Sequence, residues 1–403
     1  MSKDKKRLVP VRRFKEFENA DAWEQRKLGE VVERFDNLRI PVTSSKREKG
    51  ITPYYGANGI QDYVQGYTHD GEFVLVAEDG ANDLQNYPVH YVNGKVWVNN
   101  HAHVLQGKNK MVDNLFLVNA IKQIKIETYL VGGSRAKLNA DVMMKLPIKV
   151  PTFNEQQKIG EYFSKFDTLI TLHQRKLDKL KRVKSAYLTE MFPAEGEREP
   201  KRRFPGFTGA WEQRKLVSLF SKFTDGDWIE SKDQANTGIR LIQTGNIGIT
   251  EFINKFGNEK WISEETFKKL NCEEIFPGDI IISRLPDPAG RACILPKLDT
   301  RMITAVDCTI ARTSREASAE FIVQYLSTQT YFKYVQSCLA GGTRQRISRK
   351  NLANFNVSIP TEINEQKQIG FFFKQLDTLI ALHQRKLDKL QKLKNAYLNE
   401  MFV

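Results

Sequence analysis

The sequence predicts an α+β protein in which two tandem α/β domains are each followed by one long helix. Two observations predict this arrangement. The nonapeptide LHQRKLDKL occurs at residues 172–180 and again at 382–390, inside longer segments with regularly spaced apolar residues. The heptapeptide AWEQRKL occurs at 22–28 and again at 210–216. Internal repeats of this kind indicate duplicated structural units, so we expect two units of one architecture.

The two long helices are expected over residues 154–192 and 364–402, which share 26 identities in 39 aligned positions. Their apolar residues alternate at steps of four and three, which is the 3.5-residue period of a coiled coil. We therefore expect the helices to pair as an antiparallel coiled-coil spacer. The central positions of the expected seam are Ile170, His173, Leu177 and Leu180 in the first helix and Ile380, His383, Leu387 and Leu390 in the second. For the two histidines, packing with a hydrogen bond is favoured over a metal or switch role.

The repeats divide the chain into five segments. The segment between the first helix and the second repeat carries three prolines, three glycines and a charge run, which is typical of a linker. The predicted segments are a first body at 1–153, a first spacer helix at 154–192, a linker at 193–210, a second body at 211–363 and a second spacer helix at 364–403.

Strands are expected to dominate both bodies. In the first body, 72–78 and 94–105 alternate between apolar and polar residues, as a half-buried strand does. In the second body, 239–249 and 278–284 resemble strands, whereas 319–339 has a helical pattern. Apart from an echo just before each long helix, the bodies differ almost completely in sequence. The AWEQRKL segments and the long helices are similar in the two repeats, whereas the bodies between them are not. This contrast favours two modules with different ligands, although duplication followed by drift is the simpler alternative.

The composition favours a nucleic-acid partner. The chain has 403 residues, a net charge of +14 and a pI near 9.4. This length favours two or more domains, and an excess of positive charge suits a polyanion, although a basic protein without such a partner is an alternative. Four cysteines without a CxxC pair suit a reducing compartment. Because the chain also lacks a long apolar run and a secretory signal, we expect a cytoplasmic protein without a membrane span.

Polar residues on predicted turns are the candidates for contacts with the base edges of a nucleic acid. Arg and Lys suit guanine, and Asn and Gln suit adenine, but for each position taken alone an ordinary turn residue or surface charge is favoured over a base contact. The best candidates lie in the loops GGSRAK (132–137) and GGTRQR (341–346), where glycines allow close approach of the backbone. The first body contributes Tyr54, Tyr55, Asn58, Asn82, Asn99, His101, His103, Ser134, Arg135 and Lys137. The second contributes Arg240, Gln243, Thr244, Asn246, Arg284, Arg291, Thr343, Arg344, Gln345 and Arg346.

Sequence motifs of catalysis are missing from the chain. It contains no GxxxxGK[ST] phosphate loop, no GxGxxG and no PP dipeptide of the kind found in amino-methyltransferases. His101 and His103 form an HxH pair, but no acidic or cysteine cluster near them in the sequence completes a metal site. We therefore expect no catalytic residue and no metal ligand in this chain.

The combined pattern resembles the DNA specificity subunits of type I restriction-modification systems. The two helices that begin with NEQ and contain HQRKLDKL, each preceded by a GG[ST]R turn, carry the resemblance over nearly the whole chain. The segments TPYYGANGIQDYV (52–64), WVNNHAHVL (97–105), IRLIQTGNI (239–247) and FPGDIIISR (276–284) also resemble parts of the family's target-recognition domains.

The resemblance implies a non-catalytic subunit in which each target-recognition domain reads one half of a bipartite, asymmetric sequence in double-stranded DNA. The helices would set the spacing between the halves and dock two methylation subunits, and restriction subunits would join the full complex. S-adenosylmethionine, ATP and Mg would bind to those partners and not to this chain. Two alternatives are a coiled-coil scaffold with a non-specific basic surface and a self-sufficient DNA-modifying enzyme with an unrecognised active site.

Overall fold

The computed structural model describes residues 8–132, 136–286, 288–342 and 345–403. The chain divides into two compact units. Unit 1 comprises residues 1–174 together with 385–403, and unit 2 comprises residues 175–384. The two long helices, α4 (Phe153–Glu190) and α9 (Ile363–Met401), therefore each contribute one segment to unit 1 and one to unit 2. Among the described residues, no helix has the length and apolar character needed to span a bilayer.

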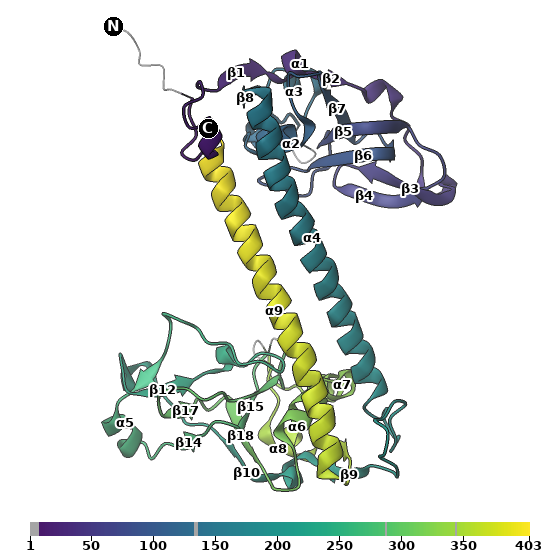
Figure 1. Ribbon diagram of the computed structural model, residues 1–403. Coiled ribbons are helices and arrows are strands. Elements are labelled where there is room, and N and C mark those ends of the chain that lie inside the picture. Colours follow the sequence, from purple (N-terminus) through teal and green to yellow (C-terminus); the bar gives the residue numbers. More distant parts are fainter. Residues whose placement is uncertain (1–7, 133–135, 287, 343–344) are drawn as a thin grey trace. The chain divides into compact units, whose positions relative to one another are not determined.

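Unit 1 is built on a six-stranded sheet with the order β2-β7-β5-β6-β3-β4 (Figure 1). All neighbours are antiparallel except β3 and β6, which are parallel. The strands are β2 (Val32–Arg34), β3 (Lys49–Gly56), β4 (Gly59–Val64), β5 (His69–Ala77), β6 (Val89–Val98) and β7 (Ala102–Gly107). A separate ribbon pairs β1 (Glu24–Lys27) with β8 (Pro147–Val150), and the short helices are α1 (Leu28–Val31), α2 (Asn114–Lys122) and α3 (Ala140–Met143).

Both faces of the unit 1 sheet are apolar because successive residues of a strand point to opposite faces. In β5, Phe73 and Leu75 belong to one cluster of buried side chains, whereas Val74 and Val76 belong to another. The second and larger cluster includes residues of α2 and both segments of the long helices that belong to unit 1. This side of the sheet is therefore covered by helices.

Unit 2 contains two sheets. The four-stranded sheet has the antiparallel order β10-β18-β15-β16, and the five-stranded sheet has the order β11-β13-β12-β17-β14. The first consists of β10 (Phe220–Asp225), β15 (Ile280–Ser283), β16 (Ala292–Ile294) and β18 (Cys308–Thr313). The second consists of β11 (Gln234–Ala235), β12 (Ile239–Ile242), β13 (Trp261–Ile262), β14 (Glu274–Ile275) and β17 (Met302–Thr304). A ribbon pairs β9 (Glu212–Lys215) with β19 (Asn356–Ile359), and the helices are α5 (Glu264–Lys269), α6 (Ala319–Tyr325), α7 (Gln329–Ser337) and α8 (Arg349–Asn354).

The two units share a core architecture. The order β10-β18-β15-β16 in unit 2 repeats the order β2-β7-β5-β6 in unit 1, with every neighbour antiparallel in both. The ribbons β1–β8 and β9–β19 also pair in the same register, four residues against four. The units differ in what is added: the β3–β4 hairpin in unit 1 and the five-stranded sheet in unit 2. This confirms the prediction of two modules with one architecture.

The Asn-Glu-Gln (NEQ) sequence at the start of each long helix makes the same contacts in both units. Glu155 accepts two hydrogen bonds from the Arg13 guanidinium at 2.6 and 2.8 Å, and Glu365 accepts two from Arg203 at 2.6 and 2.7 Å. Both carboxylates are only 1% exposed. A bidentate pair with a buried carboxylate requires fixed geometry, which accounts for the identity of this acid in both copies.

The glutamine of the same motif holds the start of a neighbouring helix. The Gln156 side chain accepts a hydrogen bond from the backbone N–H of Asp113, the N-cap of α2, at 3.0 Å. The Gln366 side chain accepts one from the backbone N–H of Ser318, the N-cap of α6, also at 3.0 Å. Each long helix is therefore tied to the shorter helix that packs on the sheet.

Within each unit, the early part of one long helix contacts the late part of the other, so the paired segments are antiparallel. In unit 1 the Tyr162 ring lies 5.7 Å from the Tyr397 ring, and in unit 2 the Tyr187 ring lies 5.1 Å from the Phe372 ring. An ion pair also recurs, between Lys394 and Asp167 in unit 1 and between Lys184 and Asp377 in unit 2. All eight predicted seam positions are buried or half-buried, namely Ile170, His173, Leu177, Leu180, Ile380, His383, Leu387 and Leu390.

Three expected elements are shorter than their sequence patterns indicate. The strand expected at 94–105 is interrupted after Val98 by a turn, because the side chain of Asn99 accepts a hydrogen bond from the backbone N–H of His101. The strand expected at 239–249 ends at Ile242 in a capped 3-10 turn. The helix expected at 319–339 is two helices, because Thr328 caps the start of α7.

Candidate nucleic-acid interface

Each unit has a loop that begins with two glycines, residues 132–137 in unit 1 and 341–346 in unit 2, here called the GG loop. In both units the residue that follows this loop is hydrogen-bonded to the residue after a central strand, β5 in unit 1 and β15 in unit 2. In unit 1 the residue after β5 is Glu78, whose carbonyl accepts a hydrogen bond from the Leu138 N–H at 2.7 Å. In unit 2 the residue after β15 is Arg284, whose carbonyl accepts one from the Ile347 N–H at 3.1 Å. The shared core therefore places the two loops at equivalent positions.

A backbone bridge closes each loop. Val131 and Lys137 exchange hydrogen bonds at 3.0 and 2.9 Å, and Ala340 and Arg346 exchange them at 3.1 and 2.9 Å. The first described glycine of each loop has a positive φ, +91° at Gly132 and +115° at Gly341, a conformation that favours glycine. The predicted contacts Ser134, Arg135, Thr343 and Arg344 lie outside the described residues.

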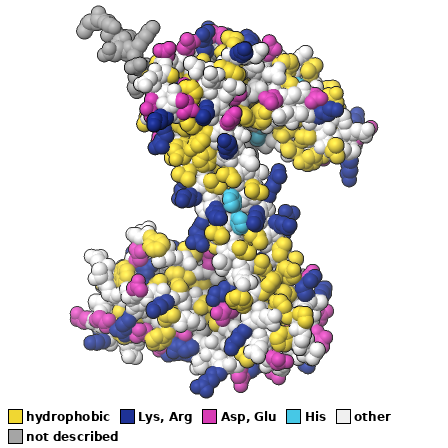
Figure 2. Space-filling model, in the orientation of Figure 1, with side chains coloured by type: hydrophobic (Ala, Val, Ile, Leu, Met, Phe, Trp, Pro, Cys, Tyr) yellow, Lys and Arg dark blue, Asp and Glu magenta, His cyan; other side chains and the backbone are white. Residues whose placement is uncertain are grey.

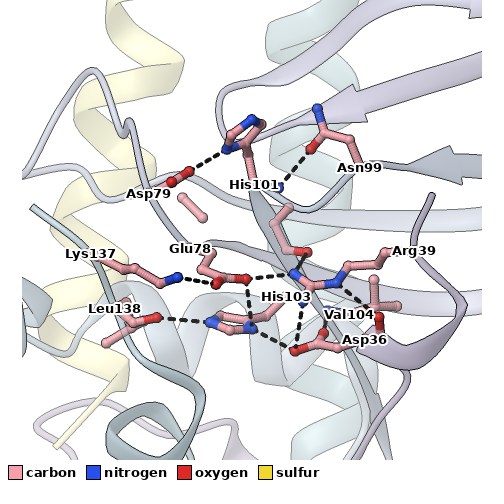
Figure 3. Close-up of polar contacts among 12 residues, drawn as sticks. Asp36, Arg39, Glu78, Asp79, Asn99, His101, His103, Val104, Lys137 and Leu138 are labelled. Carbon is pink, nitrogen blue, oxygen red and sulfur yellow. Dashed lines mark hydrogen bonds and ion pairs between the residues drawn. The ribbon is translucent and has the colours of Figure 1, made fainter. Parts of the chain in front are cut away.

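A network of charged side chains surrounds the strand end in unit 1 (Figure 3). The buried ring of His103 contacts the Asp36 carboxylate through Nδ1 at 2.7 Å and the Leu138 carbonyl oxygen through Nε2 at 2.9 Å. Burial acts to raise the pKa of Asp36, but hydrogen bonds from His103 and from the Val104 N–H outweigh it and lower that pKa. The ring therefore links β7 to the segment that follows the GG loop.

The same network fixes Lys137, one of the predicted DNA contacts. Its ammonium lies 2.8 Å from the Glu78 carboxylate, which also accepts a hydrogen bond from Arg39 at 2.6 Å. Burial acts to raise the pKa of Glu78, but the two cations outweigh it and lower that pKa. Because the Lys137 side chain is 45% exposed, it still presents positive charge to solvent.

The acids beside the two histidines correct the expectation that none lies near them. His103 lies beside Asp36 and Glu78, whereas His101, in the turn before β7, pairs with Asp79 (Figure 3). Asp36, Glu78 and His103 are the ligand types that a divalent cation takes, and their polar atoms lie within 4.8 Å of one another. Arg39 pairs with both carboxylates and Lys137 pairs with Glu78, so the arrangement is that of an ion-pair network.

Unit 2 places different chemistry at the equivalent point. Strand register pairs Ile282 with Thr309, as it pairs Val76 with His103 in unit 1. The Thr309 hydroxyl lies 3.4 Å from Asp225, and the Arg284 and Arg349 guanidiniums lie 3.6 and 3.4 Å from the same carboxylate. The Arg346 side chain is 61% exposed and lies 3.6 Å from Asp307, while Gln345 is exposed.

Burial corrects part of the predicted contact set. Arg291, for example, donates five hydrogen bonds to backbone carbonyls of residues 244–288, at 2.6–3.0 Å, and so fixes a loop. The Tyr54 hydroxyl is bonded to the backbone of Val42, and Arg240 lies over the Trp261 ring. Seven side chains are at most 9% exposed and are removed from the candidate DNA contacts, namely Tyr54, Asn99, His103, Arg240, Asn246, Arg284 and Arg291.

The remaining candidates are more accessible. Tyr55, Gln243 and Thr244 are half-buried, whereas Asn58 and Asn82 are exposed and lie together. The Asn58 side chain donates to the Gly80 carbonyl and accepts from the Asn82 N–H, both at 2.9 Å.

Asn58 and Asn82 line a cavity of about 700 Å³ together with two cations, Lys122 and Lys394. Neither lysine carries a local sequence signal of a DNA contact, and Lys394 belongs to the pattern of the helix seam. The two lysines come from α2 and from the end of α9, far from the two asparagines in the chain. Only the fold brings these residues to one cavity.

Comparisons with known proteins agree with this architecture. The family model of the type I restriction modification DNA specificity domain matches residues 20–182 and again 209–392. A Haemophilus influenzae protein described as a putative type I restriction enzyme specificity subunit is 33% identical over 363 residues, covering 88% of each chain. The MjaVIII specificity subunit of Methanocaldococcus jannaschii is 20% identical, covering 94% of this chain and 91% of its own.

A solved structure has the same fold. The S subunit of a type I restriction-modification system from M. genitalium superposes with a TM-score of 0.71 at 14% identity, covering 98% of this chain and 99% of its own. Because two copies of the family model together match most of the chain, the chain belongs to the type I restriction-modification DNA specificity family and is a DNA-recognition subunit with two target-recognition domains.

Proposed function

We propose that unit 1 and unit 2 each read one half of a bipartite, asymmetric DNA sequence, and that the long helices set the spacing between the halves. The carrying observation is one four-stranded core with two different sets of polar residues at the same place. The accessible residues beside the strand end are Lys137 in unit 1, whose side chain is 45% exposed, and Gln345 and Arg346 in unit 2, both exposed. These residues differ in charge and in hydrogen-bonding groups, so the two surfaces favour different sequences.

The proposed protein partners are two methylation subunits, each held by one long helix. Each helix exposes a pair of leucines outside the seam, three residues apart and therefore on one face. Leu169 and Leu172 on α4 are 44% and 58% exposed, and Leu379 and Leu382 on α9 are 43% and 38% exposed. A duplicated apolar patch suits two copies of one partner.

Catalytic chemistry would belong to those partners. Methylation subunits would bind S-adenosylmethionine, restriction subunits would bind ATP and Mg, and this chain would supply only the sequence preference. The observation in favour is that the described charged side chains of the polar cluster in unit 1 pair with one another.

The exchange of residues 29–153 for the first body of another family member tests this proposal. We expect one half of the recognised sequence to change, while the other half and the spacing stay the same, because the second body and both helices are untouched. The matched control exchanges residues 217–363 and should change the opposite half. A change of both halves by either exchange would contradict modular reading.

A further inference from the structure

Unit 1 contains a second cavity, of about 260 Å³, next to β3 and β6. Its lining residues include two aromatic residues, Tyr54 and Trp97, together with Arg47, Lys46, Glu48 and Gln65. The cavity is smaller than the ~300–1,000 Å³ typical of sites for drug-sized ligands, so it suits a single small ring system. None of the predicted DNA contacts except the buried Tyr54 belongs to this lining.

The two aromatic residues are held in place by hydrogen bonds to the backbone of residues 40–42. The Trp97 Nε1–H donates to the Ile40 carbonyl at 2.7 Å, and the Tyr54 hydroxyl accepts from the Val42 N–H at 2.9 Å. The two rings are stacked at 27°, with centroids 6.4 Å apart. Gly66, with φ +80°, lies against the indole, where a Cβ would come within 3.3 Å of it. The walls are therefore preformed.

Arg47 supplies a third planar wall. Its guanidinium lies 4.1 Å from the centroid of the Tyr54 ring, donates to the Val42 carbonyl at 3.1 Å and pairs with Asp62 at 3.4 Å. Bases that leave a helical stack are commonly received between aromatic rings and guanidinium planes. The cavity presents both kinds of surface.

The rim carries the groups that read and hold a nucleotide. Gln65 and Glu48 are exposed, and the pair is positioned by a backbone hydrogen bond of 2.9 Å from the Gln65 N–H to the Glu48 carbonyl. An amide and a carboxylate together offer donors and acceptors to the edge of a base, while Lys46 suits a phosphate.

The same hairpin projects an apolar side chain. Ile51 is 92% exposed on the bulge where the register of β3 against β4 shifts between Lys49 and Thr52. Gly50 allows this bulge, because a Cβ there would come within 2.3 Å of the Val64 carbonyl group. Figure 2 shows hydrophobic side chains beside Lys and Arg at the end of unit 1 that carries β3 and β4. Apolar side chains in such surroundings act as wedges between base pairs.

We propose that this cavity receives one nucleobase extruded from the bound DNA duplex, with Ile51 occupying the space that the base leaves. The proposal rests on the proposed function, since it needs DNA bound to unit 1. It assigns to Trp97 and Arg47 the stacking of the base and to Gln65 the contact with its edge.

A mismatch scan tests the proposal. The full chain, co-expressed with its proposed methylation subunits, is titrated with duplexes that carry the recognised sequence and one mismatch at each position in turn. A mismatch removes part of the cost of unpairing, so a mismatch at the extruded base should tighten binding by about tenfold. Elsewhere in the recognised half, a mismatch should weaken binding.

Two variants assign the effect to the cavity. We expect Trp97→Ala and Gln65→Ala to abolish the tightening at that position, whereas Trp97→Phe retains most of it. Gln65 is exposed, so Gln65→Ala should fold even if Trp97→Ala does not. The matched control is Gln25→Ala, on the exposed strand β1. Specific binding without a tightening mismatch, or tightening that persists in Gln65→Ala, would overturn the cavity proposal alone. If the unsubstituted protein bound all duplexes equally, whatever their sequence, the proposed function would be overturned as well.

Discussion

The buried ring of His103 is held at both nitrogens. The Leu138 carbonyl can only accept a hydrogen bond, so Nε2 carries a proton, and Nδ1 faces the Asp36 carboxylate at 2.7 Å. The ring therefore joins β7 to Asp36 and to Leu138, the residue that follows the GG loop.

We expect His103→Gln to lower the free energy of unfolding by about 2 kcal/mol, because it removes a buried ring that hydrogen-bonds the half-buried carboxylate of Asp36 and the Leu138 carbonyl. Chemical denaturation measures this loss. The control is His101→Gln, whose ring is 37% exposed and pairs with Asp79, and it should cost less than about 1 kcal/mol. Equal costs for the two variants would show that the His103 contacts are no stronger than a surface pair.

The environment of Asp227 in unit 2 should make the free energy of unfolding depend on pH. Burial, together with the charge of Glu273, raises the pKa of Asp227 to about 6, although the Glu273 N–H donates to its carboxylate. Between about pH 4, near the unfolded pKa, and pH 6, the folded state holds a proton that the unfolded state has released. Stability contributed by this group is therefore present at low pH and falls as the pH rises through that window.

Asp227→Asn should remove this loss and stabilise the protein at pH 7 by on the order of 1 kcal/mol, a value reduced for partial solvent exposure. Thermal unfolding of both proteins from pH 4 to pH 8 measures the difference, which should grow up to about pH 6 and then stay constant. A difference that is independent of pH would contradict the raised pKa.

Residue types alone could not separate DNA contacts from structural residues. Arg291 and Arg240 suit guanine as predicted, but carbonyls and rings from distant segments bury them. The acids that surround His103 are 67 and 25 residues away in the chain, so no local motif announces them. Lys137, Gln345 and Arg346 follow glycine pairs in the sequence, and all three side chains are accessible in the structure.

At the scale of elements, one glycine in each long helix is set by packing. A Cβ on Gly160 would lie 2.7 Å from Asp113 Oδ1 and 2.8 Å from Leu115 Cβ, and one on Gly370 would lie 2.7 Å from the Glu320 Cβ. The long helices therefore approach α2 and α6 too closely for any side chain. This is a physical reason for the IG dipeptide in both repeats.

Glycine to alanine normally stabilises a helix interior by about 1 kcal/mol. At Gly160 and Gly370 we expect the opposite sign, a destabilisation of about 1–3 kcal/mol, because the neighbouring helix must move. Urea denaturation of Gly160→Ala and Gly370→Ala gives the sign, with Lys181→Ala on the exposed face of α4 as a control of small effect. Stabilisation by either glycine substitution would show that the helices can separate at no cost.

The long helices were predictable because a heptad pattern over nearly 40 residues has no competing interpretation. Their bounds, Phe153–Glu190 and Ile363–Met401, lie within a few residues of the expected ones. Short elements were less predictable, because hydrogen bonds between the backbone and the side chains of Asn99, Asn246 and Thr328 interrupt strands and helices whose apolar pattern continues.

At the scale of the molecule, each compact unit contains the C-terminal part of the long helix from the other repeat. Unit 1 contains the end of α9, and unit 2 contains the end of α4. The Phe402 ring, from the second repeat, lies 5.8 Å from the Trp23 ring in unit 1, and the Phe192 ring, from the first repeat, lies 6.3 Å from the Trp211 ring in unit 2. The sequence predicted two units but not this exchange, since pairing of distant helix ends is a long-range property. It accounts for the retained AWEQRKL and MF sequences, which meet in both cores.

Because of this exchange, removal of residues 385–403 should destabilise unit 1, although they lie at the opposite end of the chain. Phe402→Ala alone should cost about 3–5 kcal/mol, the range for a buried aromatic residue. Limited proteolysis should then release fragments from unit 1 before unit 2, and Phe192→Ala should give the reverse order. The same order of cleavage in both variants would contradict the exchanged packing.

The proposed reading of two half-sites by two units has a direct readout in the host genome. Single-molecule mapping locates methylated bases in host DNA with and without this chain. We predict that deletion removes one gapped motif with two different halves, because each unit supplies the preference for one half. A methylation map that is unchanged by the deletion, or loss of a continuous motif, would contradict this reading.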